Sequence, residues 1–140
     1  MNVIPFLRGA AFYLFIYLFM GIINYGVFYL AFLLHLSYFV TLALDTVISV
    51  VALYLGFYYS LRIFVNNDLK LVNWKVGVGW ILQMLTFSVI AFGFELLLSR
   101  FFLNPKLFRV TIVFLNYFFF FVTYLAVTWW LFGKEKNEVG

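Results

Sequence analysis

The sequence contains no cysteine and only one histidine, His35. Without cysteine the chain has no disulfide framework, no thiolate metal site and no thiol nucleophile. A single histidine cannot form a metal cluster, and in a short loop we expect its side chain to be solvated. We find no nucleophile–base pair, phosphate-binding loop or metal-ligand spacing. The sequence therefore predicts neither an enzyme nor a cofactor-binding protein.

Charged residues are also scarce. They make up 10% of the 140 residues, whereas 67% are hydrophobic. Soluble domains are about half apolar and about a quarter charged, and a small fold buries only about two-thirds of its surface. The mean hydropathy of +1.10 therefore indicates a lipid environment. The net charge of +4 comes from basic residues at the ends of apolar runs, where lipid headgroups rather than nucleic acid are the natural counter-ions.

Four long apolar runs fill most of the chain, at about residues 10–34, 37–63, 76–98 and 108–132. Each reaches the roughly 20 residues that a helix needs to cross about 30 Å of hydrocarbon. Soluble strands seldom exceed about 10 residues, and membrane barrels have alternating rather than continuous apolar segments. We predict one all-α transmembrane domain, residues 1–140, with four helices in two consecutive hairpins. The similar layout of the hairpins suggests a weak parallel repeat.

The distribution of lysine and arginine predicts the orientation. Four spans place both termini on one side, with six basic residues there and three on the other. Because cytoplasmic loops carry the excess of positive charge, we expect both termini in the cytoplasm and the chain in the plasma (inner) membrane. The first group comprises Arg8, Arg62, Lys70, Lys75, Lys134 and Lys136, and the second comprises Arg100, Lys106 and Arg109. We expect the polar tail, residues 133–140, to be frayed.

Asp45 is the most informative polar residue, because it lies about nine residues into the second run, roughly 13 Å below the surface at 1.5 Å per residue. An aspartate near a helix centre costs about 2.5 to 3.5 kcal/mol on insertion scales. It could form a proton or headgroup site, or a structural carboxyl that hydrogen-bonds to Asn24 or Asn116. The amides of Asn24, Gln83 and Asn116 favour interhelical hydrogen bonds, and Gly9, Gly21 and Gly26 favour close helix contacts.

Three cations on the side opposite the termini depart from the usual charge distribution. Lys106 and Arg109 are three residues apart, and would share a face in a helix. Such a pair could receive a phosphate through charge-assisted hydrogen bonds, or anchor the chain to headgroups. Arg62 is the matching candidate on the other side. Glu95 and Arg100 favour an ion pair at the interface.

Aromatic residues make up 25% of the chain. The block Phe118 to Phe121 is typical of lipid-facing filler, although it could also line a groove for an isoprenoid chain.

Several short patterns occur together along the chain. Gly21 is followed three residues later by Asn24, within the segment 21–28. The turn His35-Leu36-Ser37 comes next, and two spans end in Arg62-Ile63-Phe64 and Trp130-Leu131-Phe132. These patterns resemble the GtrA-like family of small four-span membrane proteins, whose first span typically carries a glycine followed three residues later by asparagine. The even-numbered spans of that family tend to end in an asparagine–basic–aromatic–x–Phe pattern, whose asparagine is missing here, and Trp129 stands where a basic residue is expected.

The resemblance implies translocation of a polyprenyl-phosphate-linked sugar beside a separate membrane glycosyltransferase. Asn24, Asp45 and Asn116 lie at depths that could line a polar path, with Arg62, Lys106 and Arg109 as docking points. Because four helices leave little room, we expect a homo-oligomer. The alternative is a non-transporting partner that anchors or stabilises a glycosyltransferase. Small multidrug exporters also have four spans, but their essential carboxylate lies in the first span, where this chain has none.

Overall fold

The computed structural model describes residues 3–71, 73–101 and 104–139, with side chains described as far as residue 133. Within these ranges the chain forms four helices, α1 (Ile4–Leu33), α2 (Tyr38–Phe64), α3 (Trp74–Ser99) and α4 (Pro105–Val139). Each is long and apolar enough to cross a membrane, and the apolar part of α4 is Pro105–Gly133. The predicted all-α architecture with four candidate membrane spans is confirmed.

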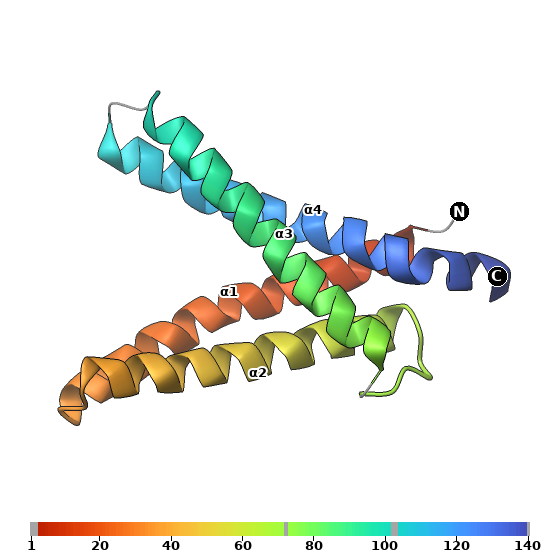
Figure 1. Ribbon diagram of the computed structural model, residues 1–140, viewed down its shortest axis with the longest axis horizontal. Coiled ribbons are helices and arrows are strands. Elements are labelled where there is room, and N and C mark those ends of the chain that lie inside the picture. The colour runs from red at the N-terminus through yellow and green to blue at the C-terminus, as the bar shows by residue number, and fades with distance from the viewer. Residues whose placement is uncertain (1–2, 72, 102–103, 140) are drawn as a thin grey trace.

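The helices pair as α1 with α2 and α3 with α4, so the predicted two consecutive hairpins are also confirmed. Both termini and the α2–α3 loop lie at one end of the molecule, which we name the terminal end (Figure 1). The two hairpin turns lie at the opposite end, the turn end. The hairpins meet near the terminal end through α1 and α4 and, less extensively, through α2 and α3. Towards the turn end they diverge (Figure 1).

The helix starts follow from local sequence chemistry. Pro5 stands in the first turn of α1, where its missing N–H is not needed. Ser37 accepts a hydrogen bond from Val40 N at the start of α2, and Asn73 accepts one from Lys75 N at the start of α3. Because Pro5 starts α1, the helix begins six residues before the predicted residue 10 and includes Arg8.

The end of α1 is a Schellman motif. Leu36 N donates to Ala31 O at 3.0 Å and His35 N donates to Phe32 O at 3.2 Å, which is the hydrogen-bond pattern of that cap. His35 takes the left-handed position with φ of 57°, where glycine is usual. Its side chain is exposed, as predicted.

The last helix differs from its predicted end. α4 continues to Val139, so the prediction of a frayed tail from residue 133 was wrong for the backbone of residues 133–139. The segment after Gly133 contains lysine and glutamate, which have good helix propensity, and it follows directly from an established helix. Hydropathy marks only where the apolar run stops, not where the helix does.

The core lies in the terminal half of the molecule, where all four helices meet. Its centre is aromatic: Tyr13 of α1 lies 5.5 Å from the Phe57 ring, 4.7 Å from Phe120 and 5.3 Å from Tyr124, measured between ring centroids. The side chains of all four residues are fully buried. Aromatic pairs at such distances contribute about 0.5 to 1.5 kcal/mol each beyond their burial. This cluster joins the two hairpins.

Two buried hydrogen-bonded groups accompany the aromatic cluster. Gln83 Nε2 donates to Thr123 Oγ1 at 3.2 Å, and the Tyr13 hydroxyl donates to Gln83 Oε1 at 3.5 Å. The Tyr124 hydroxyl and Ser60 Oγ lie 2.7 Å apart. The interpretation of Gln83 as interhelical glue is confirmed, because its amide joins α3 to both α1 and α4. With no water in a bilayer core, such pairing satisfies groups that would otherwise destabilise the fold.

Glycine permits the closest helix approaches at Gly9, Gly56 and Gly79. A Cβ atom at Gly9 would lie 2.6 Å from Tyr124 Oη, and one at Gly56 would lie 2.9 Å from the Ile16 side chain. A Cβ at Gly79 would lie 2.9 Å from Leu131. The prediction of close contact is therefore confirmed for Gly9, whereas for Gly21 and Gly26 it was wrong, because each faces open space.

Candidate functional site

Asp45 lies in α2 and its side chain is partly buried. Its Oδ1 atom is buried without a hydrogen-bond partner in the described part of the chain. The carboxyl group therefore does not bond to Asn24 or Asn116, and the structural alternative predicted from the sequence was wrong. A buried oxygen without a partner is destabilising unless something else satisfies it. Trp80 Nε1 in α3 is the other buried side-chain atom without a partner in the described structure, but Asp45 is the one that carries a carboxyl group.

A hydrogen bond joins α1 to α2 beside Asp45. Ser49 Oγ donates to Asn24 Oδ1 at 3.1 Å. Ser49 follows Asp45 by four residues, so both lie on the same face of α2, against α1. Asn24, Asp45 and Ser49 therefore form one polar group within the first hairpin. Ser49 was missed in the sequence, although its helical spacing from Asp45 was available there.

The second hairpin presents its own polar residues on the core-facing stripe of α4. Asn116 stands four residues before Phe120, which is fully buried, and seven after Arg109. These spacings place all three on one helix face. The Asn116 side chain is partly exposed, and no hydrogen bond to its amide is found among the described residues. It is available to a ligand.

One residue of each polar group, Asn24 in α1 and Asn116 in α4, extends a surface that packs in the core. Tyr17 of α1 stacks on Phe120 of α4 at 4.2 Å between ring centroids. Asn24 follows Tyr17 by seven residues, and Asn116 precedes Phe120 by four, so both continue these packed faces towards the turn end. There the hairpins diverge (Figure 1). Asp45 and Ser49 lie on the side of α2 that faces α1, in line with Gly56, which packs against Ile16 of α1. We use the name inner polar faces for Asn24 together with its neighbours Asp45 and Ser49 on the first hairpin, and for Arg109 and Asn116 on the second.

Lys106 and Arg109 lie in the first turns of α4, so the helical spacing assumed for them is confirmed. Both side chains are exposed at the turn end. Asn104 Oδ1 accepts hydrogen bonds from the backbone N–H groups of Lys106 and Leu107 at 3.0 and 3.4 Å, which fixes the start of the helix. Only Arg109 shares the stripe of Asn116.

Two other predictions concern charged residues near the ends of the helices. Arg62 was expected on the side opposite Lys106 and Arg109, and it lies there. Arg62 lies at the terminal end of α2, where its guanidinium donates to the Tyr58 hydroxyl at 2.9 Å. Tyr58 donates in turn to Leu69 O at 2.9 Å, so this chain of contacts holds the α2–α3 loop. Arg62 is therefore remote from the inner polar faces. Glu95 and Arg100 are both exposed and no ion pair joins them in the described structure, so that prediction was wrong.

The phenylalanine block does not act as a unit. Phe118 is 59% exposed and faces outward, whereas Phe120 is at the centre of the core. Phe119 and Phe121 are half-buried. The filler interpretation therefore fits Phe118 and is wrong for Phe120, because helical periodicity turns successive residues to different faces.

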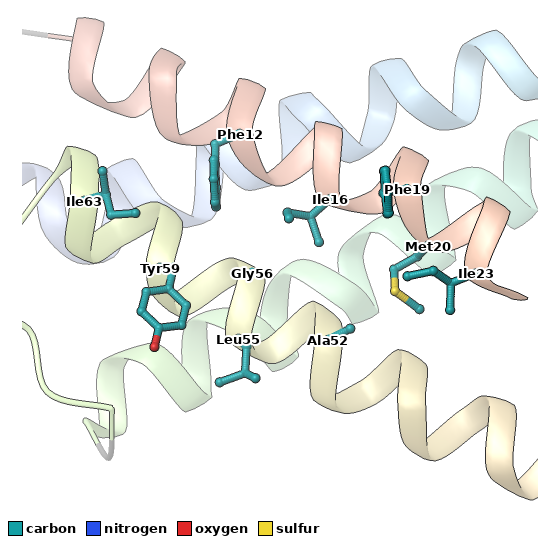
Figure 2. A pocket seen from close by; sticks show the side chains of 10 residues that line it. All are labelled: Phe12, Ile16, Phe19, Met20, Ile23, Ala52, Leu55, Gly56, Tyr59 and Ile63. Carbon is teal, nitrogen blue, oxygen red and sulfur yellow. The ribbon is translucent and has the colours of Figure 1, made fainter.

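An apolar groove of about 290 Å³ runs between α1 and α2. Neither α3 nor α4 contributes to its lining, so it opens to the outside of the bundle (Figure 2). Tyr59 carries the single polar side-chain group in the lining. The lining residues are Phe12, Ile16, Phe19, Met20, Ile23, Ala52, Leu55, Gly56, Tyr59 and Ile63.

The described residues contain no group of three or more histidine, cysteine or acidic side chains that could hold a metal ion. Comparison of the chain with protein-family models, with curated proteins and with solved structures finds no match in any of the three. The resemblance to the GtrA-like family therefore rests on the residues quoted for it, and the chain is defined here as a four-helix protein with candidate membrane spans in two diverging hairpins.

Proposed function

We propose that the chain translocates a polyprenyl-phosphate-linked sugar across the membrane for the synthesis of a cell-surface polysaccharide or glycan. The observation that carries this proposal is Asp45, whose buried carboxyl oxygen has no partner among the described residues. It lies within a candidate membrane span, on a face shared with polar side chains. A carboxyl group is retained at such depth, despite a penalty of about 2.5 to 3.5 kcal/mol, where it serves a polar ligand.

The chemistry of the inner polar faces suits a sugar. Sugar hydroxyl groups both donate and accept hydrogen bonds, so they can pair with the Asp45 carboxyl and with the amides of Asn24 and Asn116. A phosphate needs cations, which Arg109 and Lys106 supply at the turn end. Because the lipid tail can remain in the bilayer beside the helices, only the headgroup requires this polar route.

The family resemblance supports the same activity and adds three expectations. A membrane glycosyltransferase would use or supply the translocated lipid. A homo-oligomer would enclose the inner polar faces more fully than one chain does. The charge distribution favours cytoplasmic termini in the plasma (inner) membrane, which would make the turn end the extracytoplasmic end.

Translocation of a labelled polyprenyl-phosphate sugar in proteoliposomes tests the proposal. Native protein should accelerate flipping over empty vesicles. Asp45→Asn should slow it about 2- to 10-fold, because the amide loses one acceptor oxygen and a hydrogen bond is worth about 0.5 to 1.5 kcal/mol. Asp68→Asn is the matched control, since Asp68 is exposed in the α2–α3 loop, and it should flip at the native rate.

Asparagine has nearly the shape of aspartate and is not ionisable, so Asp45→Asn should fold at least as well as the native chain. Slow flipping by a folded Asp45→Asn variant therefore reports on the carboxyl group itself. If the folded native protein does not exceed empty vesicles, translocation is refuted, and the alternative of a non-transporting glycosyltransferase partner takes its place.

A further inference from the structure

The groove between α1 and α2 has the dimensions of one lipid chain within one leaflet. Along α1 it extends from Phe12 to Ile23, which is eleven residues, or roughly 16 Å at 1.5 Å per residue. The hydrocarbon core of a bilayer is about 30 Å thick, so the groove spans about one leaflet. Its volume of about 290 Å³ lies at the lower limit of small-ligand sites, about 300 to 1,000 Å³.

A cation stands at the terminal end of this groove. Arg8 precedes Phe12 by four residues, so it lies on the same face of α1, one turn beyond the apolar lining. The Arg8 side chain is exposed, and no hydrogen bond or ion pair to it is found among the described residues. One turn is about 5.4 Å, which places Arg8 at headgroup depth when the lining lies in hydrocarbon.

We propose that the groove binds an acyl chain of an anionic phospholipid from the leaflet at the terminal end, with the phosphate held by Arg8. The charge complementarity decides the occupant, because an arginine guanidinium pairs with phosphate oxygens through charge-assisted hydrogen bonds. The apolar lining accepts the chain. Ser49 and Asp45 precede the lining residue Ala52 by three and seven residues on the same face of α2, so the groove adjoins that polar group. The lipid site does not depend on the proposed translocation.

The lipid would stabilise the first hairpin. Ligands that bind the folded state raise its stability through mass action, and the acyl chain of the lipid would lie against both α1 and α2. The groove also contains the contact between Ile16 and Gly56, where a Cβ atom on residue 56 would lie 2.9 Å from the Ile16 side chain. Lipid binding is therefore expected to stabilise this close contact between α1 and α2.

Native mass spectrometry of the purified full chain tests the site, with phosphatidylglycerol and phosphatidylcholine of identical acyl chains as competing probes. A basic residue near an anionic surface contributes about 1 kcal/mol, so the anionic lipid should be preferred about fivefold. Arg8→Gln should abolish the preference and Lys70→Gln, an exposed cation of the α2–α3 loop, should retain it.

The lining is tested by a matched pair of substitutions in α2. Ala52→Phe fills the groove and should reduce adducts of both lipids, whereas Ala43→Phe, on an exposed part of the same helix, should leave them unchanged. Equal adducts of the two lipids on native protein would overturn the proposal. A dimer of the native protein that Ala52→Phe dissociates would also overturn it, because the groove would then bind a second copy of the chain. Displacement of phosphatidylglycerol by polyprenyl phosphate at equal concentration would overturn it as well.

Discussion

Replacing Gly9 by alanine probes the contact that joins the two hairpins. The new Cβ atom would lie 2.6 Å from Tyr124 Oη and 3.3 Å from Ser60 O. To make room, the Tyr124 hydroxyl must leave its 2.7 Å hydrogen bond with Ser60, or α1 must move away. Overpacking typically costs about 1 to 3 kcal/mol, and a lost interhelical hydrogen bond adds about 0.6 to 1.7 kcal/mol.

Alanine also has better helix propensity than glycine, by about 1 kcal/mol, which offsets part of this cost. We therefore expect Gly9→Ala to lower the free energy of unfolding by about 1 to 3 kcal/mol. Gly21→Ala is the control in the same helix, where nothing lies within 4 Å of the new Cβ. It should be neutral or stabilising by up to about 1 kcal/mol. Unfolding in mixed micelles, followed by circular dichroism, measures both values.

A double-mutant cycle separates this contact from a general effect of alanine. Tyr124→Phe removes the clashing oxygen, and Ser60 keeps its 2.7 Å hydrogen bond to Phe57 O. The double variant Gly9→Ala/Tyr124→Phe should lose less free energy of unfolding than the two single variants lose together, by about 1 kcal/mol or more. Equal effects of Gly9→Ala and Gly21→Ala, or strict additivity in the cycle, would refute the packing described here.

Three further predictions concern the turns and the orientation. His35→Gly should raise the free energy of unfolding by about 1 kcal/mol, because His35 holds a left-handed φ that disfavours a Cβ atom; no gain in a micelle titration would contradict this. Tyr58→Phe should lower the free energy of unfolding by about 1 to 3 kcal/mol, because Leu69 O loses its buried donor. Tyr59→Phe should lower it much less in the same titration. In intact cells, His35→Cys should react with an impermeant thiol reagent and Asp68→Cys should not; the reverse pattern would place the termini outside.

The helices could be predicted from sequence because span length and hydropathy are properties of contiguous residues. Most predicted limits are within a few residues of the observed ones. The early start of α1 depends on Pro5 and the late end of α4 on propensity, and hydropathy registers neither. The helical spacing of Lys106 and Arg109 was predictable for the same reason, since it requires only that the segment be helical.

Contacts between helices could not be predicted, because they depend on how each helix is rotated about its axis. The amphipathic signal is weak in a span whose outer face is as apolar as its core. Gly9 and Gly21 are therefore alike in sequence, although only Gly9 meets another helix. The same ambiguity hid the pairing of Ser49 with Asn24 and the groove between α1 and α2.

Photo-cross-linking tests most directly whether the headgroup travels along the inner polar faces. A photoreactive side chain would be placed at Asn24 or Asn116, and for comparison at Tyr25 or Phe118, which are 76% and 59% exposed on outward faces. With a radiolabelled polyprenyl-phosphate sugar whose label is in the sugar, positions 24 and 116 should cross-link and excess unlabelled lipid should compete. Equal or stronger labelling from positions 25 and 118 would contradict the account.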